Sequence, residues 1–126
     1  MMTAKKINRI IAAVIFLISL FIYLRTIAPT TSFWDCGEFI ACSYILGIPH
    51  PPGAPLYLLL GRIFSLIPLA ADIGLRVNII SAVTTALSIM FTYLIIVQLI
   101  KLWRGVPQKI EDYILKYSAG VIGALA

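Results

Sequence analysis

Charged side chains are scarce in this sequence. Only 12% of its 126 residues are charged, and it contains five acidic residues in all. Soluble domains average about 25% charged residues and about 45–50% apolar ones, whereas this chain is 61% hydrophobic and has a mean hydropathy of +1.02. The composition excludes an intrinsically disordered chain, argues against a soluble globular domain and indicates an integral membrane protein.

Cysteine and histidine are also rare. The chain contains Cys36, Cys42 and a single histidine, His50, and it has no CxxC pair, Gly-rich phosphate loop or Ser-His-Asp order. Two cysteines six positions apart on one helix face different ways, so a disulfide between them would need the helix to be broken. We interpret both as small packing residues.

The net charge of +5 does not indicate a nucleic-acid partner, because the basic residues form no stripe interleaved with aromatic residues. Most of them flank hydrophobic runs instead, at Lys5, Lys6, Arg9, Lys101, Arg104 and Lys109. This distribution follows the positive-inside rule and predicts a lipid bilayer as the main surroundings of the chain.

Two runs approach the ~20 apolar residues needed to cross a bilayer, and we predict spans over about residues 7–25 and 77–100. The basic tail before the first run would also fit a signal peptide. Thr26-Ile27-Ala28 is a poor cleavage site, however, and Tyr23 and Arg25 resemble interfacial anchors. We therefore predict an uncleaved anchor with a cytoplasmic N-terminus.

The remaining segments complete a multi-pass topology. Residues 26–76 are the predicted outer loop with interfacial helices, since Leu56–Ile67 is short for a crossing and is interrupted by Arg62. Residues 101–112 form a cytoplasmic loop, and residues 113–126 begin a third span, unless they lie on the surface. The predicted fold class is an all-α integral membrane bundle, of which this is the N-terminal portion.

The outer loop contains two carboxylates three positions apart. Asp35 and Glu38 would lie on one face of a helix, with Gly37 between them leaving space for a ligand near the backbone. Ser32 or Asp35 can cap this helix, and Gly47 is its predicted stop. A carboxylate here could deprotonate an acceptor hydroxyl or help to hold a divalent cation. Asp at the N-cap with Glu at N3 also describes a capping box without any substrate, and the residues alone do not separate these interpretations.

Three further residues are candidate substrate-binding groups. His50, in the turn Pro49–Gly53, could contact a phosphate, act as an acid–base group or simply bond to loop carbonyls. Arg76, like Arg62, could pair with a lipid phosphate or extend toward headgroups. Trp34 could stack on a sugar or belong to the interfacial aromatic belt.

The order of these parts resembles the N-terminal end of a GT-C glycosyltransferase, the multi-spanning class that uses polyprenyl-phosphate sugars. The resemblance is carried by Trp34-Asp35-Cys36-Gly37-Glu38-Phe39, His50-Pro51-Pro52-Gly53 and Arg76-Val77-Asn78. Within this class the chain resembles, over essentially its whole length, a bacterial family first defined as a domain of unknown function. The animal relatives of that family are transmembrane O-mannosyltransferases acting on extracellular receptor domains.

The resemblance implies transfer of a sugar such as mannose from a polyprenyl phosphate to a protein or glycan hydroxyl, outside a bacterial plasma membrane. It implies that Asp35 orients or deprotonates the acceptor, while Glu38 does not reproduce the adjacent acidic pair of some relatives. His50 and Arg76 fall where relatives place polar residues near the donor phosphate. The polyprenyl-phosphate sugar is the donor substrate, no residue is assigned as a metal ligand, and a requirement for a divalent metal stays open. Without the family's later spans and C-terminal soluble region, this stretch alone is not expected to be active.

Two other functions stay open at this point. One is a small non-catalytic membrane subunit whose loop docks a partner. The other is a lipid- or polysaccharide-modifying transferase of the same fold.

Overall fold

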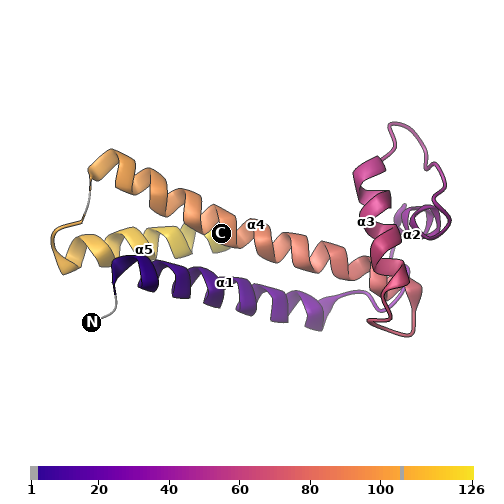
Figure 1. Cartoon of the computed structure of the whole chain (residues 1–126), viewed down its shortest axis with the longest axis horizontal. Coiled ribbons are helices and arrows are strands. Elements are labelled where there is room, and N and C mark those ends of the chain that lie inside the picture. The colour runs from indigo at the N-terminus through magenta and orange to yellow at the C-terminus, as the bar shows by residue number, and fades with distance from the viewer. Residues whose placement is uncertain (1–2, 106) are drawn as a thin grey trace. The chain divides into compact units, whose positions relative to one another are not determined.

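The computed structural model describes residues 3–105 and 107–126, and within them the chain is helical and contains no strand. The prediction of an all-α chain is therefore confirmed. The helices, in chain order, are α1 (Ala4–Thr26), α2 (Cys36–Ile45), α3 (Pro55–Leu66), α4 (Ile73–Arg104) and α5 (Ile110–Leu125) (Figure 1).

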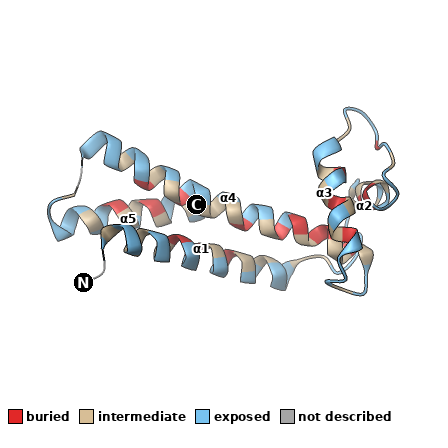
Figure 2. Ribbon diagram, in the orientation of Figure 1, coloured by how far each residue is buried: buried red, intermediate tan, exposed pale blue. Residues whose placement is uncertain are grey.

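Two of these helices, α1 and α4, are long and apolar enough to cross a membrane. Much of their surface is exposed (Figure 2), and it carries large apolar side chains such as Leu17, Phe21 and Leu99. A soluble protein rarely leaves so many of them uncovered, whereas lipid solvates them. The chain divides into two compact units, one made of residues up to Ile22 with Thr85–Ala126, the other of Tyr23–Thr84.

The first unit packs α5 against parts of α1 and α4. Its buried core is Ala12, Ile15, Tyr93 and Val97, and Tyr117, Val121 and Ala124 of α5 pack against it. The approach at Gly120 is close, because a Cβ there would lie 2.7 Å from Val97 and 3.0 Å from Tyr93. Small residues permit such close helix packing in lipid.

The second unit packs α2 and α3 against the first turns of α4, around Ile40, Val77 and Ile80. Asp35 is the N-cap of α2, and Pro55 opens α3 at a position where its missing N–H costs nothing. The C-cap of α2 is Leu46, in the left-handed region at φ 55°, so the predicted stop at Gly47 lies one residue too late. The Gly47 N–H instead donates to the Cys42 carbonyl at 2.9 Å.

A glycine–serine contact fixes the spacing of α2 and α3. A Cβ on Gly61 would lie 2.3 Å from Ser43 Oγ and 2.6 Å from Ser43 Cβ. The Ser43 hydroxyl is buried and has no hydrogen-bond partner among the described residues. Its place in α2 is therefore set by its small size rather than by its polarity.

Gly61→Ala is expected to destabilise the protein by about 1–3 kcal/mol, because the added methyl overlaps Ser43. Ser43→Gly in the same chain should restore much of that loss, because it removes the hydroxymethyl group that the added methyl would overlap. Thermal unfolding in detergent measures both variants. A Gly61→Ala protein as stable as the parent would contradict the packing described here.

Candidate functional site

Asp35, Glu38 and His50 meet at the start of α2 in the second unit. The His50 main-chain N–H donates to Glu38 Oε1 at 2.8 Å, and its ring Nδ1 lies 2.8 Å from Glu38 Oε2. The other ring nitrogen, Nε2, is 3.9 Å from Asp35 Oδ2. Two carboxylates, 15 and 12 positions before His50, thus form one acid–histidine–acid cluster with it.

The capping-box interpretation of the two carboxylates is wrong. Asp35 does occupy the N-cap position, but its side chain makes no capping hydrogen bond. Both Glu38 oxygens bond to His50 instead of reaching back to the start of the helix. The carboxylates therefore face the proline-rich turn, and the Asp35 side chain does not cap the helix.

Aromatic packing and the turn itself hold the His50 ring in place. Phe39 meets it edge-on with ring centroids 5.9 Å apart, and Phe39 also meets Tyr57 of α3 edge-on at 5.7 Å. The His50 carbonyl accepts a hydrogen bond from the Gly53 N–H at 3.0 Å, and Gly53 has a φ of 75°, which favours glycine. Groups from α2, α3 and the turn thus jointly orient the imidazole.

Glu38 and His50 shift each other's pKa. The side-chain hydrogen bond from His50 holds the pKa of Glu38 below its usual value of 4.5, and the same bond raises the pKa of His50 above 6.5. All three groups are exposed, with 48% of the His50 side chain and 49% of the Asp35 side chain open to solvent. When His50 is protonated, its Nδ1–H donates to Glu38 and its Nε2–H points toward Asp35.

The same three residues offer a donor set for a divalent cation. One ligand atom from each lies within 4.8 Å of the others, giving two carboxylate oxygens and one imidazole nitrogen. Carboxylates with an imidazole suit several divalent metals. A cation bound through Nδ1 would have to displace the proton now shared between His50 and Glu38, because a metal-binding histidine must be deprotonated there.

The remaining candidates are placed differently. The side chain of Trp34 is exposed, with 94% of the residue open to solvent, and its backbone is left-handed at φ 66° directly before Asp35. Arg76 donates to the carbonyls of Ala70 at 2.6 Å and Ser65 at 3.0 Å. These partners lie in α3 and the following linker, so Arg76 joins the end of α3 to α4, and its recorded bonds do not reach the cluster.

Arg62 is bound within the second unit as well. Its guanidinium donates to the Tyr44 carbonyl and lies 5.6 Å from the centroid of the Tyr44 ring. Arg62 therefore connects α3 to α2. The sequence had suggested a lipid phosphate as a partner for this side chain.

Sequence reasoning missed the role of Asn78. This residue is 9% exposed, and its amide donates to the carbonyls of Ala28 at 3.1 Å and Thr30 at 2.9 Å. Its Oδ1 accepts from the Cys36 thiol at 3.7 Å. Asn78 thereby ties the segment leading into the cluster to α4. The sequence feature that could have indicated this role is the amide side chain of Asn78 within an apolar helix, because a buried amide needs hydrogen-bond partners.

Glu38→Gln is expected to lower the pKa of His50 toward 6.5, because the neutral amide no longer stabilises the imidazolium. In the parent, the ion pair is intact below 6.5 and is lost as the pH rises through the raised pKa of His50. It is also lost as the pH falls through the lowered pKa of Glu38. An NMR titration measures the pKa of His50, and the imidazole signal is assigned because it is absent from the spectrum of His50→Gln. Asp35→Asn is the control and should lower the pKa less, and an unchanged pKa in Glu38→Gln would contradict the pairing.

Comparison with known proteins finds a matching family and a similar curated protein. Residues 35–126 match the sequence model of the Protein O-mannosyl-transferase TMEM260 N-terminal domain, a stretch that includes all three cluster residues. The chain is 36% identical over 75 residues to "Protein O-mannosyl-transferase tmem260" of Dictyostelium discoideum. That match covers 58% of this chain but 9% of the relative, and no solved structure matches.

Proposed function

The chain belongs to the TMEM260 N-terminal domain family of protein O-mannosyl-transferases, and from that premise we propose that it carries the acceptor-activating loop of a GT-C membrane glycosyltransferase. The observation that supports this most directly is the exposed cluster of Asp35, Glu38 and His50, in which the Asp35 side chain makes no capping hydrogen bond to α2. Since the chain spans 9% of the curated relative, the complete reaction requires parts beyond this region.

The proposed reaction moves mannose from a polyprenyl phosphate to a protein hydroxyl. Asp35 accepts the hydroxyl proton while the acceptor oxygen forms a bond to the anomeric carbon of the sugar. The bond from that carbon to the phosphate oxygen breaks, and the polyprenyl phosphate leaves with the bonding electrons. A positioned base is most effective within hydrogen-bond reach of the proton that it removes, which an exposed carboxylate at a loop permits.

His50 and Glu38 have supporting roles in this proposal. The Nε2 of His50, 3.9 Å from Asp35, stabilises the phosphate as it leaves, because negative charge develops on that group. Glu38 is a positioning residue: one of its hydrogen bonds holds the His50 main chain, and the other holds the His50 ring and raises its pKa. The exposed Trp34, next in sequence to Asp35, is the proposed sugar-stacking group.

We also propose a membrane orientation for this loop. The start of α1 and the end of α4 carry Lys5, Lys6, Lys101 and Arg104, which the positive-inside rule places in the cytoplasm. If both helices span the membrane, the segment between them, with Asp35 and His50, lies on the extracytoplasmic side. That is the side on which a secreted or surface protein presents its hydroxyls.

The test is sugar transfer by the full-length protein in membranes. Labelled polyprenyl-phosphate mannose should be consumed, with label appearing on acceptor protein, and polyprenyl-phosphate glucose should be used poorly. Label appearing only on lipid or polysaccharide would replace the proposed acceptor. Consumption of no polyprenyl-linked sugar would favour a non-catalytic docking subunit.

A further inference from the structure

The first unit contains a second candidate site, formed by the beginning of α1, the end of α4 and α5. It is a cavity of about 390 Å³, within the size range of ligand pockets. Three lysines line it, one from each helix: Lys5, Lys101 and Lys116. The other polar groups of the lining include Asn8, Gln98 and Tyr117.

Lys116 is the central cation of this site. It is 6% exposed, and its ammonium lies 4.9 Å from the ring centroid of Tyr113 and 4.5 Å from that of Tyr117. Aromatic faces attract a cation but leave its charge uncompensated. Among the described residues, no carboxylate forms an ion pair with Lys5, Lys101 or Lys116.

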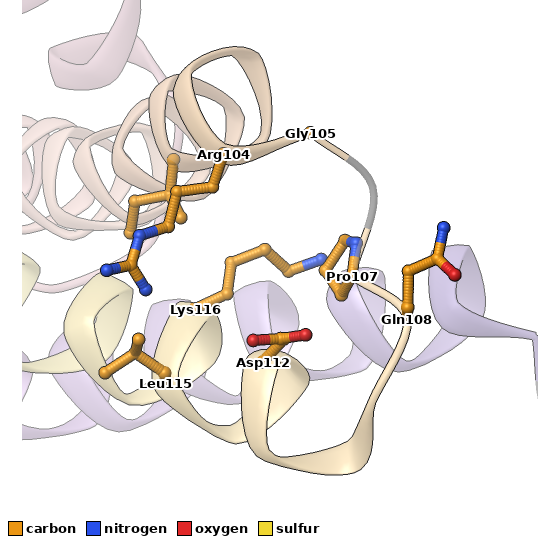
Figure 3. Close-up of a pocket in the computed structure, with 8 residues that line it drawn as sticks. Arg104, Gly105, Pro107, Gln108, Asp112, Leu115 and Lys116 are labelled. Carbon is orange, nitrogen blue, oxygen red and sulfur yellow. The ribbon is translucent and has the colours of Figure 1, made fainter.

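A neighbouring cavity makes a useful comparison. It has a volume of about 330 Å³ and shares Lys116 and Pro107 with the first (Figure 3). Asp112 lines this second cavity together with Arg104, so carboxylate and cation are both present there. In the described part of the chain, no carboxylate lines the three-lysine cavity. The site with uncompensated positive charge is therefore the one between α1, α4 and α5.

Three ammonium groups around one cavity repel each other, and an anion between them removes that cost. Lysine is a common phosphate-binding residue, and charge-assisted hydrogen bonds to phosphate are strong. Lys5 lies in the first turn of α1, and Lys101 in the last turn of α4. The ends of two helices that cross a bilayer lie near the phosphates of the lipid headgroups.

We propose that this cavity binds the phosphate headgroup of an anionic phospholipid, held by Lys5, Lys101 and Lys116. Asn8 and Gln98 also line the cavity and carry amide groups that can hydrogen-bond to the headgroup. The inference rests on α1 and α4 crossing the membrane and not on the sugar-transfer reaction. The two can therefore fail separately.

The experiment measures lipid binding to the full-length protein in detergent by native mass spectrometry, with phosphatidylglycerol as the probe. Lys5→Gln and Lys101→Gln should each weaken binding about fivefold, the factor that corresponds to about 1 kcal/mol per basic residue near a membrane surface. Lys6→Gln is the matched control, since it removes the same charge one residue away and does not line the cavity. It should change binding less than about twofold. Phosphatidylcholine should bind at least about tenfold more weakly than phosphatidylglycerol.

Three results would overturn the proposal. These are equal binding of phosphatidylcholine, equal losses in Lys6→Gln and Lys5→Gln, or displacement of the lipid by millimolar inorganic phosphate. The last result would identify a soluble phosphate as the ligand. Lys116→Gln should give the largest loss, but its burial can impair folding. The double variant of Lys5→Gln with Lys101→Gln, expected to lose about 25-fold, decides the question without it.

Discussion

Asp35→Asn should lower the kcat of sugar transfer by the full-length protein about 10²- to 10⁴-fold, the usual contribution of a positioned general base. Asparagine has nearly the same shape as aspartate but cannot take the proton of the acceptor hydroxyl. The Asp35 carboxylate makes no capping hydrogen bond, and asparagine is an equally good N-cap residue, so α2 should still form. The free energy of unfolding should fall by about 1 kcal/mol or less, because the variant loses the interaction of a negative charge with the helix dipole.

Asp72→Asn is the matched control for this variant. Asp72 also precedes a helix, and its Oδ1 accepts a hydrogen bond from the Leu75 N–H at 3.0 Å, which asparagine can keep. Its activity should stay within about twofold of the parent. Full transfer activity in Asp35→Asn at normal yield would remove Asp35 from the chemistry. A similar loss in both variants would assign the effect to the fold instead.

The helices were the most predictable part of this chain. The long apolar runs are enough to locate α1 and α4, because a bilayer requires that length and composition. Pro55 predicts the start of α3 because its fixed φ suits a first turn. The end of α2 at Ile45 could not be predicted from Gly47, because the left-handed C-cap residue is Leu46 and leucine rarely adopts that conformation.

The candidate site could be predicted only in part. The sequence selects Asp35, Glu38 and His50 as polar residues between apolar runs, but their partners depend on how the turn after α2 folds back. The spacing of the two carboxylates alone also fits a capping box, and only the bonds from His50 to Glu38 remove that alternative. The partners of Arg76 were equally out of reach, because its bonds to the Ala70 and Ser65 carbonyls depend on how the segment after α3 folds.

Asn78→Asp, which replaces only the side-chain NH2 group by oxygen, should lower the free energy of unfolding by about 3–5 kcal/mol. We expect this to be the most damaging isosteric substitution in the second unit. Asn78 is buried, and its amide donates to two carbonyls, of Ala28 and Thr30. An aspartate of the same shape would direct a carboxylate oxygen at those carbonyls, leaving either a buried charge or an unsatisfied acid. Unfolding in detergent, followed across a denaturant series, measures the loss.

Comparison with Asn78→Leu separates hydrogen bonding from packing. Leucine is apolar and of similar size, so it leaves the two carbonyls unbonded without adding charge, at a cost of about 1–3 kcal/mol. Because Asn78 holds the segment that leads to Asp35, both variants should also reduce sugar transfer, in the same order as their losses of stability. If Asn78→Asp were as stable as Asn78→Leu, the donor role of the amide would be wrong. If activity stayed normal in a folded Asn78→Leu protein, the loop would not need this tie to α4 to keep Asp35 and His50 in place.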